Sequence, residues 1–266
     1  MRFERAIIDI RPRRIFEILD LSLRFYRAHL GRLLGTVVLF ALPAVSLGFT
    51  VYYLFDSLLF GGLVFFFVMP VSSHAVVLAA SRLVFGTEIG LSELRALYRP
   101  VWLSLFFRRL LQRILWVPLF PLVAGEIIRL GYVFSPMIVL LERLTGLPGT
   151  LRRKSLNREG GVRAFVFDLA VAFTALVLVV ALAFFADLVA SDIVDIWEFG
   201  GLFEDVASSA AKVTLWLVFF AVISPVVDLA WFFFYLDTRI RKEGWDLELG
   251  FKAMAKRLKP RVNDAA

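Results

Sequence analysis

The chain has 266 residues, of which 60% are hydrophobic and 20% charged, and its mean hydropathy is +0.79. One soluble core cannot bury so much apolar surface, and this surface is grouped in long uninterrupted runs, so we expect lipid to surround the chain. The absence of cysteine excludes disulfides, thiolate metal sites and thiol catalysis, and the net charge of +7 lies in short stretches between the apolar runs, where it favours anionic lipid headgroups over nucleic acid.

Residues 1–32 predict a cytoplasmic segment with a helix that begins after Arg14. An apolar stripe on this helix is typical of a helix lying in the membrane interface, and the alternative is packing on the protein's own cytoplasmic helices. The stripe consists of Phe16, Leu19, Leu23, Tyr26 and Leu30. A cleaved signal peptide is not expected, because this charged and amphipathic segment precedes the first apolar run.

Two long apolar runs follow, at 33–55 and 58–81, and each is long enough to cross a hydrocarbon core of about 30 Å. Only Asp56 and Ser57 separate them, so we expect a tight helical hairpin. Pro43 and Pro70 lie inside the runs and predict kinks.

Residues 82–113 predict a mixed cytoplasmic and interfacial stretch, followed by two short apolar runs at 114–125 and 130–141. A helix of that length rises about 18 Å, so the runs either cross with their flanks drawn in or form a re-entrant pair. Glu126 and Arg129 are spaced to pair at the outer tip of this hairpin. A single crossing over 114–141 is not favoured, because it would place the basic residues of 143–163 on the outer side.

The last two membrane segments are predicted at 164–190 and 213–236. The loop between them, 191–211, is acidic and lacks Lys and Arg, which favours the outer face. Residues 237–266 form a cytoplasmic tail in which a second amphipathic helix is expected. Its apolar positions are Leu247, Phe251, Met254 and Leu258.

The distribution of basic residues predicts the orientation. Of the 30 Lys and Arg residues, 28 fall in 1–32, 82–113, 143–163 and 239–261. The positive-inside rule therefore places both termini in the cytoplasm, and the fold expected is an all-α bundle of six membrane segments in a bacterial inner membrane.

Three motifs resemble a family of bacterial membrane proteins, the glycerophosphoryl diester phosphodiesterase membrane-domain type. The N-terminal motif is RP at 11–12 with FEILD at 16–20 and FYRAHLG at 25–31, the middle motif is Glu142, Gly146 and LRRKSL at 151–156, and the C-terminal motif is YLDTRIRKEGWDLE at 235–248. The resemblance implies a membrane domain and suggests lipid handling. The stretch from Arg113 to Glu142 is shorter than is usual in the family. The soluble phosphodiesterase domain of the family is not found in these residues, so enzymatic activity is not expected.

The C-terminal motif also has a physical interpretation. Its charges alternate in sign directly after the last segment, so pairs can form among them, with Gly244 as a helix break. The alternative is a solvated charge run that only stops the span. The charged positions concerned include Asp237, Arg239, Arg241, Glu243 and Asp246.

Few residues suggest chemistry. His29 and His74 lack partners at catalytic or metal-binding spacing, so no catalytic residue, metal or cofactor is expected. His74 in the second segment is expected to form a hydrogen bond between helices.

An ionisable group within the last segment is Asp228, which should face protein because an unpaired carboxylate in hydrocarbon costs several kcal/mol. The favoured interpretation is a structural pair with Arg108, Arg109 or Arg113. The alternatives are a site for a transported cation or proton and snorkelling toward the inner headgroups.

These observations favour a non-enzymatic scaffold or accessory subunit that contacts anionic lipid and a protein partner or a second copy of itself. The second hypothesis is a small transporter or channel that uses intramembrane polar residues, and the third is lipid handling.

Overall fold

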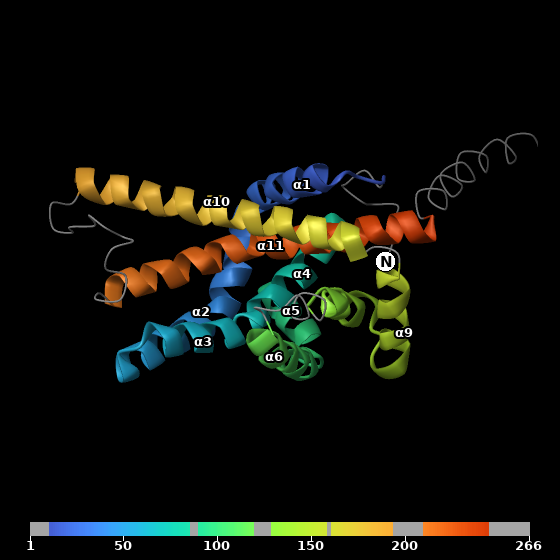
Figure 1. Ribbon diagram of the computed structural model, residues 1–266, viewed down its shortest axis with the longest axis horizontal. Helices are drawn as coiled ribbons and strands as arrows, with labels where there is room; N and C mark the ends of the chain where they lie inside the picture. Colours follow the sequence, from blue (N-terminus) through green and yellow to red (C-terminus); the bar gives the residue numbers. More distant parts are fainter. Residues whose placement is uncertain (1–10, 86–89, 120–128, 159–160, 194–209, 245–266) are drawn as a thin grey trace, which may run out of the picture.

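The structure is a computed structural model that describes residues 11–85, 90–119, 129–158, 161–193 and 210–244, and these residues form helices and no strand. The elements in chain order are α1 (Ile15–Ala28), α2 (Leu30–Phe55), α3 (Leu58–Val68), α4 (Pro70–Val84), α5 (Leu91–Tyr98), α6 (Trp102–Leu119), α8 (Ser135–Met137), the π-helix η2 (Ile138–Glu142), α9 (Gly146–Asn157), α10 (Gly161–Ile193) and α11 (Ala210–Glu243). Figure 1 shows α10 and α11 side by side along the long axis of the molecule.

Four helical stretches are long and apolar enough to cross a membrane. They are Leu30–Phe55, Leu59–Val84, Gly161–Phe185 and Ala221–Glu243. They correspond to the first, second, fifth and sixth predicted segments, so the chain has the all-helical, apolar architecture of a membrane protein.

The third and fourth predicted segments have a different form. α6 begins at Trp102 and runs through Arg113 without a break, and 130–141 is divided between a helical turn, α8 and η2. The sequence around Pro136 therefore does not make one straight crossing helix. Residues 120–128, with Glu126, lie outside the described part of the chain, and the total of six segments stays a prediction.

The second membrane stretch is interrupted at Met69, directly before Pro70, where α3 ends and α4 begins. Proline cannot donate a backbone hydrogen bond to the preceding turn, which explains the interruption. Pro43, by contrast, lies inside the continuous helix α2.

The helix at the centre of the fold is α11, which contacts α1, α2, α4 and α10. In the most apolar stretch of α11, 72% of the residues are buried, whereas only 17% are buried in the corresponding stretch of α10. Phe234 stacks on Phe167 of α10 with ring centroids 4.2 Å apart, and Trp231 meets Phe167 edge-on at 5.1 Å. Such ring pairs stabilise by about 0.5–1.5 kcal/mol beyond their burial, so α11 is held mainly by protein contacts.

The N-terminal helix α1, which covers most of the amphipathic helix predicted over 15–32, packs on α11 and α10. Ile18 and Phe25 are buried, Phe25 meets Phe233 edge-on at 5.3 Å, and Phe16 of the predicted lipid-facing stripe is 77% exposed. Apolar residues cover more than one face of this segment, so contact with α11 selects the buried face. Packing on α11 is therefore shown for one face of α1, and the position of this helix in the membrane interface stays a prediction.

The charged C-terminal motif begins on α11, which continues past the predicted end of the last segment to Glu243. Gly244, with a φ of +61°, ends the helix as its sequence position suggested. The predicted amphipathic helix of the tail and Asp246 lie outside the described residues, as does most of the acidic loop.

Candidate functional site

The side chain of Asp237, near the end of α11, is only 2% exposed. Its carboxylate accepts hydrogen bonds from the backbone N–H of Arg13 (2.6 Å) and from Nε of Arg241 (2.9 Å), and it forms an ion pair with Arg163. The backbone oxygen of Arg13 in turn accepts hydrogen bonds from Arg241 (2.7 Å) and Arg163 (3.2 Å). Asp237 therefore connects the backbone of Arg13, two residues before α1, with the start of α10 and the end of α11.

A second centre of charge lies around Glu142, the last residue of η2. Glu142 accepts a hydrogen bond from the hydroxyl of Tyr235 and pairs with Arg152 (2.8 Å) and Arg239 (3.4 Å). Glu243 pairs with the same two arginines, at 2.8 Å from Arg239. Burial alone would lower the pKa of Arg152, but its hydrogen bonds to Glu142 and Glu243 outweigh this and raise the pKa above its ordinary value.

The spacing of these residues explains why one helix supports both centres. Tyr235, Arg239 and Glu243 recur every four residues and form one stripe of α11, which meets η2 and α9. Asp237 and Arg241 are also four residues apart, on another stripe that meets Arg13. The two centres together are called the ionic network, which consists of Arg13, Glu142, Arg152, Arg163, Tyr235, Asp237, Arg239, Arg241 and Glu243.

Each carboxylate of the ionic network has several donors, which suits a structural joint. An unpaired buried ion costs several kcal/mol, so such a network is stable only when its charges are matched. Among the described residues, no group of three His, Asp or Glu side chains is placed to hold a metal ion.

Part of the ionic network follows from the sequence. The alternating charges predicted pairs within the C-terminal motif, and Asp237–Arg241 and Arg239–Glu243 are such pairs. The links to η2, α9 and α10 had no local signal, because their partners lie at least 74 residues away. Among the sequence features, only the middle motif had indicated Glu142 and Arg152.

A second polar group surrounds Asp228, halfway along α11. Its carboxylate hydrogen-bonds to Ser73 of α4 and lies in the electrostatic field of Arg109 and Arg113 of α6. In the described part of the chain, no ion pair within 4.0 Å joins Asp228 to an arginine, and its Oδ2 is buried without a hydrogen-bond partner. Two of the three arginines proposed from the sequence therefore face Asp228, at longer range than a direct pair.

His74 lies near the same two arginines. Its Nδ1 is 3.2 Å from the hydroxyl of Tyr98 on α5, which is a hydrogen bond between helices of the kind expected. Its Nε2 is buried and lacks a hydrogen-bond partner among the described residues, as does Nη1 of Arg113. The guanidinium of Arg113 lies 4.1 Å over the ring of Phe66. We call the set Ser73, His74, Arg109, Arg113 and Asp228 the Asp228 cluster.

Arg129, predicted at the outer tip of the central hairpin, forms an ion pair with Asp168 of α10. Asp168 is only about 10 Å along α10 from the start of that helix at Gly161. Arg129 is therefore close in level to the end of α10 that carries Arg163 of the ionic network.

Arg108, the third arginine proposed for Asp228, lines a pocket on another face of α6. The structure thus gives the three arginines of 108–113 two different surroundings, the pocket and the Asp228 cluster, which the sequence could not distinguish. A scan of protein-family models, a search of curated proteins and a search of solved structures each gave no match to this chain.

Proposed function

We propose that the chain is a non-enzymatic integral protein of a bacterial inner membrane, with both termini in the cytoplasm, that acts as a scaffold or accessory subunit. Its partners in this proposal are anionic lipid headgroups and either another protein or a second copy of the chain. The single observation that carries the scaffold role is the ionic network, in which carboxylates and arginines tie together three parts of the chain distant in sequence.

The surface of α10 supports an intramembrane position. Large apolar side chains are exposed along its length, among them Leu169 (63%), Phe173 (66%) and Phe184 (65%). Exposure of such a helix to water costs about 25 cal/mol for each Å² of apolar surface, so lipid or a partner helix must cover it.

The convergence of basic stretches supports the orientation. Arg13, Arg152 and Arg239 belong to three of the four basic stretches of the sequence and meet in the ionic network. A single strongly basic end of the bundle favours the cytoplasmic side by the positive-inside rule.

The family resemblance is part of the same proposal. The middle and C-terminal motifs that carry it contribute Glu142, Arg152, Tyr235 and Asp237 to the ionic network, and Arg13 adjoins the N-terminal motif. A shared structural joint would explain why these three short motifs occur together.

The scaffold role is tested on the full chain, purified in mild detergent from the native membrane. We expect an assembly of fixed stoichiometry, containing a second copy or one protein partner, measured by light scattering coupled to size exclusion. The variant Phe173→Ser should reduce its mass without loss of the protein from the membrane fraction. A monomer in both cases would contradict the proposal.

A small transporter or channel is the second candidate, and the Asp228 cluster favours it. Three buried polar atoms that lack a hydrogen-bond partner among the described residues lie on α4, α6 and α11, where a water molecule or a proton could bind. The test is proton or cation flux in liposomes containing the wild-type chain or Asp228→Asn. Flux that the variant abolishes, with unchanged elution and melting, would establish transport and refute the scaffold role.

A further inference from the structure

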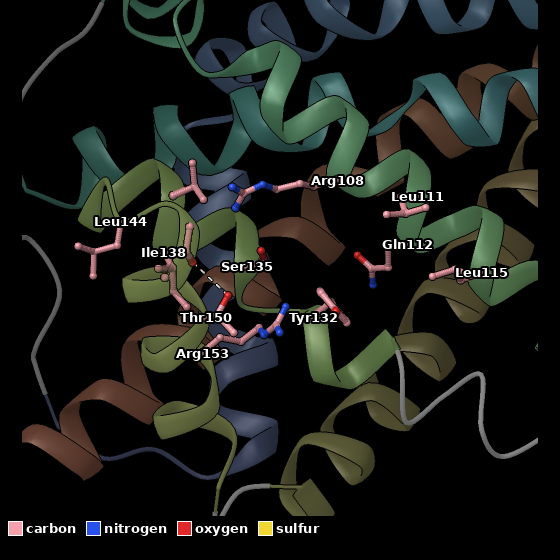
Figure 2. A pocket seen from close by; sticks show the side chains of 13 residues that line it. Arg108, Leu111, Gln112, Leu115, Tyr132, Ser135, Ile138, Leu144, Thr150 and Arg153 are labelled. Carbon is pink, nitrogen blue, oxygen red and sulfur yellow. Dashed lines mark hydrogen bonds between the residues drawn. The ribbon is translucent and has the colours of Figure 1, made fainter.

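A pocket of about 360 Å³ lies between α6 on one side and α8, η2 and α9 on the other. Figure 2 shows Arg108 extending from α6 and Arg153 from α9 toward the space between the two helices, with Ser135 and Tyr132 between them. This volume falls at the lower end of the range usual for small-molecule sites.

One face of α6 forms the first wall of the pocket. Arg108, Leu111, Gln112 and Leu115 line it, and their i, i+3, i+4, i+7 spacing places them on a single stripe of the helix. The stripe changes from a cation at one end to leucines at the other. Leu111 and Leu115 are 60% and 47% exposed, so the apolar end opens to the surroundings of α6.

The facing wall on α9 has the same spacing. Gly146, Gly149, Thr150 and Arg153 line the pocket from one stripe of α9. A Cβ atom at Gly146 would meet nothing within 4 Å, whereas one at Gly149 would lie 2.8 Å from the backbone oxygen of Leu144. The hydroxyl of Thr150 donates to the backbone oxygen of Gly146 (3.1 Å). Arg153 is the cation of this wall.

Among the residues that the structure describes, no carboxylate compensates the charges of the pocket. None of the described lining residues is acidic. In the described part of the chain, Arg108 has neither an ion pair nor a hydrogen bond, and the guanidinium of Arg153 stacks 3.8 Å over the ring of Tyr132. The neighbouring Arg152, in contrast, is bound by Glu142 and Glu243. Two adjacent arginines of α9 thus have different roles.

We propose that this pocket binds the phosphate group of an anionic phospholipid, with Arg108 and Arg153 holding the phosphate and Leu111 and Leu115 guiding the acyl chains out of the pocket. Guanidinium groups match phosphate oxygens in geometry, and stacking on Tyr132 holds one of them in place. Along α6 the lining of the pocket changes from charged to apolar. An anion with an attached apolar chain matches this change better than a fully soluble anion does. The proposal rests on the membrane position proposed above and names the lipid site of that scaffold.

The experiment uses the full chain in neutral detergent. The ligands are dioctanoyl phosphatidylglycerol, zwitterionic dioctanoyl phosphatidylcholine and inorganic phosphate, and binding is measured as the rise in melting temperature with ligand concentration. The pocket variant is Arg108→Gln with Arg153→Gln. The control is Arg95→Gln with Arg99→Gln on α5, which removes the same charge from two exposed positions outside the pocket.

We expect the phosphatidylglycerol affinity to fall at least tenfold in the pocket variant and less than threefold in the control, with little binding of phosphatidylcholine. Equal losses in both variants would overturn the proposal, because the attraction would then be general electrostatics. Inorganic phosphate binding as tightly as phosphatidylglycerol would overturn it too, since the leucine wall would have no role.

Membrane insertion is measured separately, as resistance of the protein to carbonate extraction. A chain that stays in the membrane but does not bind phosphatidylglycerol refutes the lipid site alone. A chain released by carbonate refutes the proposed function itself. If Arg153→Gln disturbs folding through the loss of its contact with Tyr132, the single variant Arg108→Gln, whose side chain is exposed, must still weaken binding at least threefold.

Discussion

Arg163 at the start of α10 and Asp237 near the end of α11 form an ion pair across 74 residues of sequence, and the carboxylate is almost completely shielded from solvent. The two helices are thereby fixed to each other at one end. About one helical turn away from this pair, the same helices meet through Phe167 and Phe234, whose rings stack nearly parallel. A charged contact and an aromatic contact thus set the alignment of α10 on α11.

The variant Asp237→Asn should lower the stability of the protein. It leaves Arg163 and Arg241 without their anion, and loss of one partner of a buried pair costs about 3–5 kcal/mol, with a value near the lower end expected because both arginines are partly exposed. The measurement is the melting temperature in detergent. The matched control is Asp20→Asn, whose exposed i,i+4 pair with Arg24 is worth ~0–1 kcal/mol. Similar losses in the two variants would mean that the ionic network is not a structural joint.

Arg152→Lys should also destabilise the protein, although it keeps the charge. One ammonium group cannot reproduce the guanidinium geometry that binds Glu142 through Nε and Glu243 through Nη2. Arg158→Lys, at an exposed position at the end of the same helix, should have no effect. Hydrogen exchange over η2 and α9 measures the local loosening, and unchanged protection in the Arg152 variant would contradict the bridging role.

Gly61→Ala and Gly62→Ala should act in opposite directions. A Cβ atom at Gly61 would lie 2.7 Å from the backbone oxygen of Gly48 and 2.9 Å from Cβ of Tyr52, so α2 and α3 would have to separate. Overpacking of this kind typically costs about 1–3 kcal/mol. At Gly62 nothing lies within 4 Å, and alanine is the better helix former by about 1 kcal/mol. Melting of both variants in detergent provides the test, and a Gly61→Ala protein as stable as Gly62→Ala would exclude this close approach.

The proposed orientation predicts opposite labelling of two single cysteines, which the cysteine-free sequence permits without background. Ser57→Cys lies between α2 and α3 and should react with a membrane-impermeant maleimide in cells with an intact inner membrane. Ser155→Cys, exposed on α9, should react only after the inner membrane is permeabilised. The reverse pattern would invert the topology.

Local features of the sequence were sufficient to predict the apolar helices. The hairpin turn at Asp56 and the break at Gly244 were both evident, because each depends on the composition of a short stretch and on residues that tolerate a positive φ. The pairs Asp237–Arg241 and Arg239–Glu243 could also be predicted from the sequence, since helical spacing alone brings them together.

Contacts between distant segments were decided only by the tertiary structure. Periodicity could not tell which apolar residues of α1 meet another helix, and only the fold shows that Phe25 contacts Phe233 of α11. The adjacent arginines of α6 and α9 were equivalent in sequence until the fold placed Arg152 beside Glu142 and left Arg153 facing a pocket without carboxylates. Composition and helical period thus determine which segments are helical and apolar. The partner of each charge is determined by where segments far apart in the chain meet, because the strength of an electrostatic contact depends on distance and burial in space.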